Sequence, residues 1–323
     1  MARTTLLLLA CLVLLTTTYA KVLVIGATGR VGSTIVSSLL AHGVPTNILV
    51  RDMAKAAADK RLEGCQMFQG DMTSTEALIE ACKDCDAVID VHGVKNRFTK
   101  ARDLFLHPRG DPTHPYNVNF LGTKRVLAAM AVNKVPKIVR ITGALVDTNP
   151  FSPFIVLFNC LLAKSNKWHQ MSEKAIRESG VDYTVLRPTG LRTDPTTPLL
   201  RSRLLLPVDK REKFKVPAQI AVADVAALCV LASQSQALSK ATVICSTKLT
   251  EEGVVESKSW EELVAARQDW QDTRKIVPSP HNLALLLYTS ILSALLAALG
   301  RLFFVAARGV ARCFVKGAVR GAI

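Results

Sequence analysis

Short runs of aliphatic residues alternate with longer segments of helical periodicity along most of the chain. The aliphatic runs predict strands at 21–26, 46–51, 65–71, 86–91, 137–142, 182–188 and 241–246. The helical segments predict helices at 33–40, 76–83, 118–133, 166–179, 222–233 and 259–270. Strands that read as nearly continuous apolar runs are typical of parallel sheets with both faces covered. The pattern therefore predicts an α/β fold over residues 21–270.

Residues 1–20 have the layout of a secretory signal peptide. One arginine is followed by an apolar stretch from Leu6 to Leu15, and Ala20 ends a short polar run. About ten apolar residues are too few to span a bilayer, so we expect cleavage after Ala20. A leader into the secretory pathway and endoplasmic reticulum fits this layout, and so does a signal-type leader into a plastid.

A second apolar segment follows a linker at 271–282 that contains two prolines. Residues 283–299 carry no charge. As a helix they would extend about 25 Å, slightly less than a hydrocarbon core of about 30 Å. Basic residues then recur every four positions, at Arg308, Arg312, Lys316 and Arg320. We expect residues 283–323 to form a membrane helix and a basic amphipathic tail that binds membrane lipids. The alternative is a C-terminal core helix.

Charge and cysteine spacing narrow the class of ligand. The formal net charge is +15, but seven basic and no acidic residues lie from Arg274 onward, so much of the excess belongs to the tail. The sequence has no zinc-finger spacing, basic zipper or aromatic RNA-binding motif, and we predict no nucleic-acid partner. Cys82 and Cys85 have CxxC spacing, but no second Cys or His pair completes a metal site. We therefore predict no bound metal.

Three glycines separate the first predicted strand from the next helix, in KVLVIGATGRVG. Such glycines permit a sharp turn, the approach of the backbone to a pyrophosphate and close packing of helix on strand. The free N–H groups at the start of the helix attract the phosphates. The sequence thus predicts a Rossmann-type doubly wound parallel sheet and a dinucleotide cofactor. The expected contacts are Gly26, Thr28, Gly29, Arg30, Val31 and Gly32.

The end of the second predicted strand favours NADP as the cofactor. A carboxylate there would hold a ribose hydroxyl, whereas Arg51, with Lys55 one turn later, suits a 2′-phosphate. Asp52 competes for the ribose hydroxyl. Asp71 and Met72 follow the third strand and are expected to border the adenine, although Asp71 also suits a helix cap.

Three further residues are expected at the cofactor because the carboxyl ends of parallel strands line the binding crevice. His92 and Gly93 follow the fourth predicted strand, and Pro188 ends the sixth. His92 is a neighbour of the cofactor in this interpretation, and its alternative role is proton donation.

The ordered motifs resemble the NmrA-like, NAD(P)-binding branch of the atypical short-chain dehydrogenase/reductase superfamily. The matching stretches are VLVIGATGRVG, ILVRDMAKA, CDAVIDV, NVNFLGTKRVLAAM, SEKAIRESGVDYTVLRPTGL, IAVADVAALCV and SWEELVAA. The resemblance covers residues 21–270 and implies an NAD(P)-binding fold with a small C-terminal substrate region.

The resemblance also implies a departure at the catalytic positions. The superfamily signature is Tyr-x-x-x-Lys, preceded by a serine beyond the fifth strand. Here Ser165 stands in place of the tyrosine, His169 in place of the lysine and Thr142 in place of the serine. His169 is expected to contact the nicotinamide ribose or, with an ordinary pKa near 6.5, to donate a proton.

Three segments are expected to form the substrate pocket. Residues 93–115 are rich in basic side chains, residues 149–164 present phenylalanines at near-helical spacing, and residues 189–216 are rich in Pro, Arg and Lys. Together they predict an apolar pocket with a cationic rim for an apolar or anionic small molecule. Alternatively, the Phe-rich segment docks on a bilayer or on the core.

These features favour a membrane-anchored, NADPH-dependent oxidoreductase that transfers hydride to such a molecule. The loss of the Tyr-x-x-x-Lys pair favours a different class, a non-catalytic NADPH-sensing or assembly protein with a membrane protein partner. The missing tyrosine argues against a third class, an enzyme that modifies lipids or sugar nucleotides.

Overall fold

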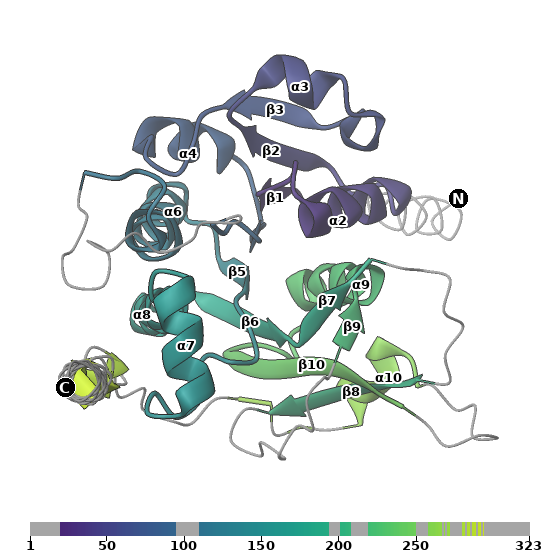
Figure 1. The fold of residues 1–323 in the computed structure, drawn as a ribbon. Helices are drawn as coiled ribbons and strands as arrows, with labels where there is room; N and C mark the ends of the chain where they lie inside the picture. The colour runs from purple at the N-terminus through teal and green to yellow at the C-terminus, as the bar shows by residue number, and fades with distance from the viewer. Residues whose placement is uncertain are drawn as a thin grey trace, which may run out of the picture.

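The computed structural model describes residues 20–94, 110–193, 201–207, 219–249 and 258–266, and short runs between 268 and 293. These residues form one α/β sheet with helices packed on both of its faces (Figure 1).

Ten strands form the sheet, in the order β3-β2-β1-β4-β5-β6-β10-β9-β7, with β8 paired to β10. Their bounds are β1 Val22–Ile25, β2 Thr46–Val50, β3 Gln66–Gln69, β4 Ala87–Asp90, β5 Lys137–Ile141, β6 Asp182–Pro188, β7 Gly190–Arg192, β8 Arg201–Pro207, β9 Gln219–Ala221 and β10 Ala241–Leu249. Neighbours from β3 through β6 to β10 are parallel. The chain starts at the central β1, winds outward to β3, and then returns to wind outward through β4 to β6. This order confirms the predicted Rossmann-type doubly wound sheet and all seven predicted strands.

Helices cover both faces of the sheet (Figure 1). Their bounds are α2 Arg30–Ala41, α3 Met53–Ala57, η1 Lys60–Leu62, α4 Thr75–Ala81, η2 Tyr116–Leu121, α6 Gly122–Asn133, α7 Pro153–Leu161, α8 Ser165–Glu178, α9 Val222–Gln234 and α10 Trp260–Ala265. Helices α2 and α9 pack on one face with one hydrophobic core, and α4, α6 and α8 pack on the other face with a second core.

The alternation of side chains along β1 explains why its sequence is continuously apolar. Val22 and Val24 enter the core beneath α2 and α9, whereas Leu23 and Ile25 enter the core beneath α4 and α6. Successive residues of a strand point to opposite faces, and both faces of the sheet are covered, so all four side chains are buried.

Several elements differ from the sequence prediction. The helix predicted at 118–133 is divided into a π-helical turn, η2, and α6. The helix predicted at 259–270 is the shorter α10, which begins with a capping box of Ser259 and Glu262. Strands β7, β8 and β9 were not predicted. Strands β7 and β9 are only three residues long, and β8 carries two arginines, so none of the three gives a clear apolar pattern.

The structure gives no support to the membrane helix predicted at 283–323. Among the described residues, none of the helices has the length and apolarity needed to cross a bilayer. Most of that segment, most of the predicted linker and residues 1–19 lie outside the described residues. The described residues between 281 and 293 are helical and contact α7.

Candidate functional site

The turn between β1 and α2 has a backbone that only glycine fits. Gly26 has a φ of +88°, a conformation that L side chains rarely adopt. A Cβ on Gly32 would lie 2.1 Å from the carbonyl oxygen of Gly26, so no side chain fits there. Helix α2 begins directly after Gly29, and no side chain caps its first turn. The first N–H groups of α2 therefore face outward at the positive end of a helix, as an anion site requires.

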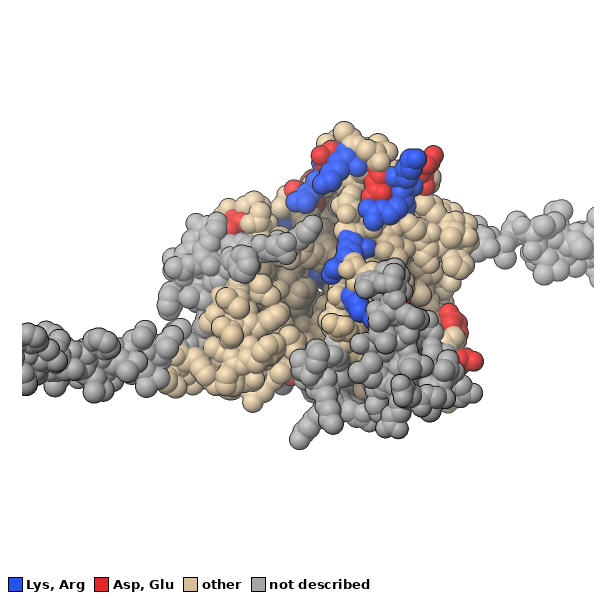
Figure 2. Space-filling view, turned by 45° about the vertical axis from the view of Figure 1, so that its right-hand side comes forward, with Lys and Arg blue, Asp and Glu red and all other residues tan. Residues whose placement is uncertain are grey.

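Basic side chains gather around the start of α2 and the end of β2. Arg30, Arg51 and Lys55 are exposed at the start of α2, after β2 and on α3. Figure 2 shows Lys and Arg side chains gathered toward the top of this face, beside a hollow at its middle. Asp52, the competing carboxylate, is the N-cap of α3 and accepts the backbone N–H of Lys55 at 2.9 Å. Its carboxylate is thus engaged within its own helix.

Asp71 closes a turn after β3. Its Oδ1 accepts the backbone N–H of Thr73 at 2.7 Å and also the Thr73 hydroxyl. The hydrogen bond from Thr73 is the main cause that lowers the pKa of Asp71, and Arg51 contributes less. The N-cap of α4 is Ser74, so the helix-cap alternative for Asp71 is wrong.

His92 lies between the glycine turn and α6. A Cβ on Gly26 would meet the backbone nitrogen of His92 at 3.0 Å. A Cβ on Gly122 would meet Nε2 of His92 at 3.3 Å and Cε of Met72 at 3.0 Å. Nε2 of His92 also lies 2.8 Å from the carbonyl oxygen of Val118. The structure therefore brings three predicted cofactor residues, Gly26, Met72 and His92, into one place.

The other predicted contacts lie at the same edge of the sheet. Thr28 is exposed in the turn before α2, and Val31 is half-buried in the first turn of that helix. Gly93 is exposed, and a Cβ there would have no atom within 4 Å. Pro188 is buried at the end of β6, where its carbonyl accepts the backbone N–H of Ala144 at 3.0 Å.

Two charged side chains that the sequence analysis missed are buried beside His92. Asp90 ends β4 and Arg140 lies in the adjacent β5, and both have no exposed surface. Nη1 of Arg140 lies 2.9 Å from Oδ1 of Asp90 and donates to the carbonyl oxygen of His92 at 3.0 Å. Nδ1 of His92 also contacts Oδ1 of Asp90. Burial alone would raise the pKa of Asp90, but Arg140 and His92 outweigh it and lower the pKa overall. The carboxylate is therefore ionised at neutral pH.

Asn119, in η2, connects the two residues that stand in place of Tyr-x-x-x-Lys. Its side-chain nitrogen lies 3.3 Å from Oγ of Ser165 and 3.2 Å from Nε2 of His169. The carbonyl oxygen of Asn119 accepts the hydroxyl of Thr123 at 2.8 Å. The Asn119 amide thus lies between Ser165 and His169. Helix α8 begins at Ser165, directly after Lys164, which has a φ of 59°.

The imidazole of His169 is uncharged at neutral pH. Burial, followed by the positive charge of Arg140, lowers the pKa of His169 to about 3. Its Nδ1 is buried and has no hydrogen-bond partner among the described residues. His169 therefore has no imidazolium proton to give to a substrate at neutral pH. The buried positive charge of this site is on Arg140.

Thr142 belongs to a separate network at the ends of β5 and β6. Its hydroxyl donates to Oε1 of Glu173 at 2.7 Å. Arg187 donates from Nε to the same Oε1 at 3.0 Å and pairs with Asp147 at 2.7 Å. Burial opposes the charge of Arg187, but Glu173 and Asp147 outweigh that effect and raise its pKa. Thr142 is therefore held by a buried ion pair, and no described contact joins it to Ser165 or His169.

The sequence contained a signal for the missed residues. Asp90, Arg140 and Arg187 are charged residues inside otherwise apolar strands, and such residues must find partners when the strand is buried. Asn119 and Glu173 give no comparable signal, because polar residues are ordinary on helices.

Parts of the predicted pocket walls, at 95–109, 194–200 and 208–216, lie outside the described residues. Of the Phe-rich segment, Phe151, Phe154 and Leu161 are exposed. Ile155 and Val156 of the same segment are buried, so α7 packs against the rest of the protein through one side.

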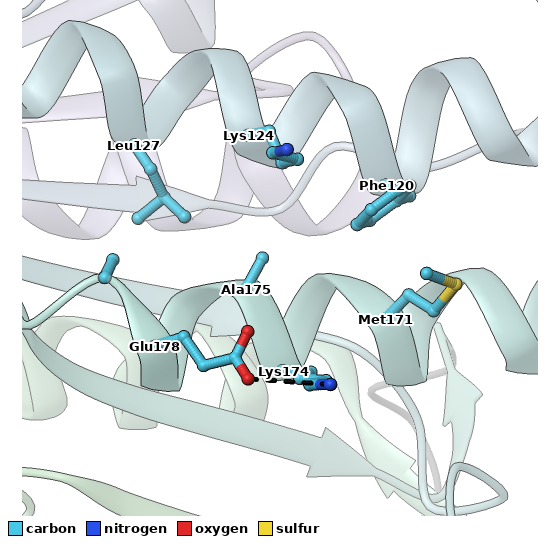
Figure 3. A pocket seen from close by; sticks show the side chains of 8 residues that line it. Phe120, Lys124, Leu127, Met171, Lys174, Ala175 and Glu178 are labelled. Atoms are coloured by element: carbon cyan, nitrogen blue, oxygen red, sulfur yellow. Dashed lines mark ion pairs between the residues drawn. The ribbon is translucent and has the colours of Figure 1, made fainter. Parts of the chain in front are cut away.

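A second hollow, of about 400 Å³, lies between α6 and α8 (Figure 3). Phe120, Lys124, Met171 and Lys174 line it, and Lys174 pairs with Glu178 at 3.6 Å. It contains none of the predicted site residues, so the candidate site remains the edge of the sheet around His92.

A sequence model described as NAD(P)H-binding matches residues 26–236, which is more than half of the chain. The chain belongs to this NAD(P)H-binding family. The match begins at Gly26 and includes every described site residue discussed above. It confirms the resemblance to NmrA-like, atypical short-chain dehydrogenase/reductase proteins.

Curated relatives of this NAD(P)H-binding chain include plastid proteins. An uncharacterized chloroplastic protein of Arabidopsis thaliana is 33% identical over 55% of this chain and 61% of its own length. The Photosystem II assembly factor Ycf39 of Cyanophora paradoxa is 28% identical over 53% of this chain and 45% of its own length. The chain spans less than two thirds of the length of these relatives.

Solved structures agree with the fold. A short-chain dehydrogenase/reductase from Veillonella parvula, in complex with NADP, has a TM-score of 0.54 over 75% of this chain and 100% of its own chain. Its sequence identity is 15%, so the likeness concerns the fold alone.

Proposed function

We propose that this chain is an NADPH-dependent oxidoreductase that acts on an apolar or anionic small molecule. The observation that carries the proposal is the glycine turn, where Gly32 lets α2 pack directly on the backbone of Gly26 and the uncapped start of α2 leaves N–H donors for a pyrophosphate. When bound, NADPH supplies a hydride from its nicotinamide. Gly26, Gly29, Thr28 and Val31 would hold the phosphates.

The preference for NADPH rests on charge at the end of β2. Arg51 and Lys55 are exposed cations, whereas the carboxylate of Asp52 is engaged with the backbone of α3. Asp52 accepts a backbone N–H through Oδ1, and the two neighbouring cations suit a 2′-phosphate.

The residues proposed to lie near the nicotinamide, Ser165 and His169, orient the ligands by hydrogen bonds and are uncharged at neutral pH. Ser165 accepts a hydrogen bond from Asn119, so its own hydroxyl proton is available to a ligand. His169 is an uncharged imidazole at neutral pH. This favours the ribose-contact role of His169, and a proton for a reduced substrate would then come from water or from the substrate.

A specific observation favours the second candidate, a non-catalytic NADPH-sensing or assembly protein. Both residues in place of the catalytic pair, Ser165 and His169, share one amide donor, and the histidine is uncharged. One relative bears the name of a Photosystem II assembly factor. In this candidate, binding of NADPH would alter affinity for a membrane protein.

We place the protein in a plastid and at a membrane in the same proposal. The plastid origin is supported by the chloroplastic relative. Membrane association is supported by the apolar sequence from residue 283 and the basic positions after it.

The first test is the cofactor preference of Arg51→Glu. The change should weaken NADPH binding by about 1–3 kcal/mol, roughly 5- to 150-fold in Kd, and leave NADH binding almost unchanged. Titration of nucleotide fluorescence measures both affinities. Arg61→Glu is the matched control, because Arg61 is exposed and pairs with Asp59. Equal losses for the two nucleotides would refute the 2′-phosphate assignment.

The second test separates the two candidates. NADPH oxidation is measured against quinones, flavins, carbonyl compounds and tetrapyrroles, with His169→Ala beside the exposed His42→Ala as control. An oxidoreductase should turn over one class and lose rate only in His169→Ala. Tight NADPH binding without turnover in any class would favour the sensing protein.

A further inference from the structure

Two segments carry nearly all the exposed large apolar side chains of the described residues. The described residues include nine such side chains, and eight of the nine lie within 151–161 or 283–291. They are Phe151, Phe154, Leu157, Leu161, Leu283, Leu286, Leu287 and Ile291. Apolar side chains scattered over a surface are ordinary, but a gathered set marks a contact surface.

The two segments lie side by side, as Figure 1 shows for α7 and the C-terminal end of the chain. Val156 of α7 packs with Ala284, and Cys160 and Tyr288 pack against them. The Tyr288 hydroxyl donates to the carbonyl oxygen of Phe151 at 2.7 Å. The exposed side chains of both segments therefore belong to one surface.

Each segment presents a second apolar face away from this contact. On α7 that face consists of Phe154, Leu157 and Leu161, which are 56%, 58% and 48% exposed. On the C-terminal segment it consists of Leu283, Leu287 and Ile291. Successive members of each set are three or four positions apart, which places each set on one side of a helix. A helix that is apolar on both sides needs apolar surroundings on both.

Charge identifies the occupant as lipid. Neither α7 nor residues 281–299 contain Lys, Arg, Asp or Glu, so the two segments contribute no charge of their own to the surface. The sequence continues with LLAALGRLFFVAA and then with Arg308, Arg312, Lys316 and Arg320, without an acidic residue. Apolar residues followed by spaced cations suit the interface of a bilayer with anionic headgroups.

We propose that α7 and residues 281–293 form a lipid-docking surface that inserts into the interface of an anionic bilayer. The inference deepens the membrane association in the proposed function and rests on it. Helix α7 ends at Leu161, and α8 begins at Ser165 on the way to His169. Docking would thus hold the nicotinamide end of the site near the lipid, where an apolar substrate dissolves.

The test is a tryptophan placed on this surface of the full chain, Leu157→Trp. The native Trp168, Trp260 and Trp270 are at most 4% exposed, so the added indole is the one that lipid can reach. Vesicles of phosphatidylglycerol with brominated acyl chains should shift its emission to shorter wavelength and quench it, and phosphatidylcholine vesicles should do so less. Val132→Trp is the matched control, because Val132 is 63% exposed on α6, away from the surface. It should not be quenched.

Three outcomes would overturn the proposal. Equal quenching of Leu157→Trp and Val132→Trp would show that contact with lipid is not specific to the surface formed with α7. Emission of Leu157→Trp that is blue-shifted without vesicles, and unaffected by them, would mean that residues 294–306 or a second copy cover the surface. Sedimentation velocity separates those two cases. NADPH titration of the same variant distinguishes failure of this proposal from failure of the proposed function. Intact nucleotide binding without quenching refutes the lipid-docking surface alone. Quenching without nucleotide binding refutes the oxidoreductase alone.

Discussion

Replacing Arg140 with Met should destabilise the fold by about 3–5 kcal/mol at pH 7. Arg140 is fully buried and lies 2.9 Å from the buried carboxylate of Asp90. Met fills a similar volume without charge, so the change leaves Asp90 ionised in an apolar interior with only His92 beside it. The expected loss is a large part of the roughly 5–15 kcal/mol that holds a domain folded.

The loss should depend on pH in a direction that the pKa of Asp90 determines. In the parent, Arg140 and His92 hold that pKa below its ordinary value. The ion pair therefore stabilises the fold above about pH 4 and stops doing so as pH falls through the lowered pKa. In Arg140→Met, burial raises the pKa of Asp90 instead. The gap in stability between parent and variant should thus widen as pH rises and narrow on acidification.

Urea unfolding followed by circular dichroism between pH 5 and 8 measures this gap. The double variant Asp90→Asn with Arg140→Met should recover part of the stability, because no buried charge remains. Arg61→Met is the control, because the guanidinium of Arg61 is exposed. The urea midpoint of this variant should equal that of the parent. A gap that is absent at pH 7, or that does not change with pH, would refute the account of this buried pair.

Three further predictions concern single sites. Gly32→Ala would place a Cβ 2.1 Å from the carbonyl oxygen of Gly26, so it should cost about 1–3 kcal/mol of stability and abolish NADPH binding, whereas Gly110→Ala, with no atom within 4 Å of the added Cβ, should change neither. Melting curves and nucleotide titration check both, and an unimpaired Gly32→Ala would contradict the steric argument. The ring of His169, with a pKa lowered to about 3, should show no NMR titration between pH 8 and 5, and because the unfolded ring takes up a proton near pH 6.5, its contribution to stability should decline as pH falls below that value; a titration near 6.5 would show an accessible, ordinary imidazole. Burial raises the pKa of Cys82 to about 12, so a thiol reagent at pH 8 should label it only after unfolding, and rapid labelling of the native protein would contradict its placement.

The sequence by itself determined those parts of the structure that depend only on residues close together along the chain. Val22 to Ile25 are apolar in succession because both faces of β1 are covered, so the strand could be predicted without its partners. The spacing of Gly26, Gly29 and Gly32 likewise predicted the turn, since its geometry is set within one strand and one helix. The order of such units was sufficient for the doubly wound sheet.

Only the tertiary structure decided which distant groups meet at the site. Arg140 is paired across 50 positions with Asp90, and Asn119 reaches His169 across a similar distance along the chain. The protonation of His169 follows from those neighbours and from burial, neither of which periodicity records. The exposure of Phe154 and Leu157 was equally unpredictable, because an apolar helix looks the same in sequence whether its outer face meets core, partner or lipid. Local pattern encodes which backbone forms, whereas charge, solvation and exposure are set by contacts between segments that the chain brings together only when it folds.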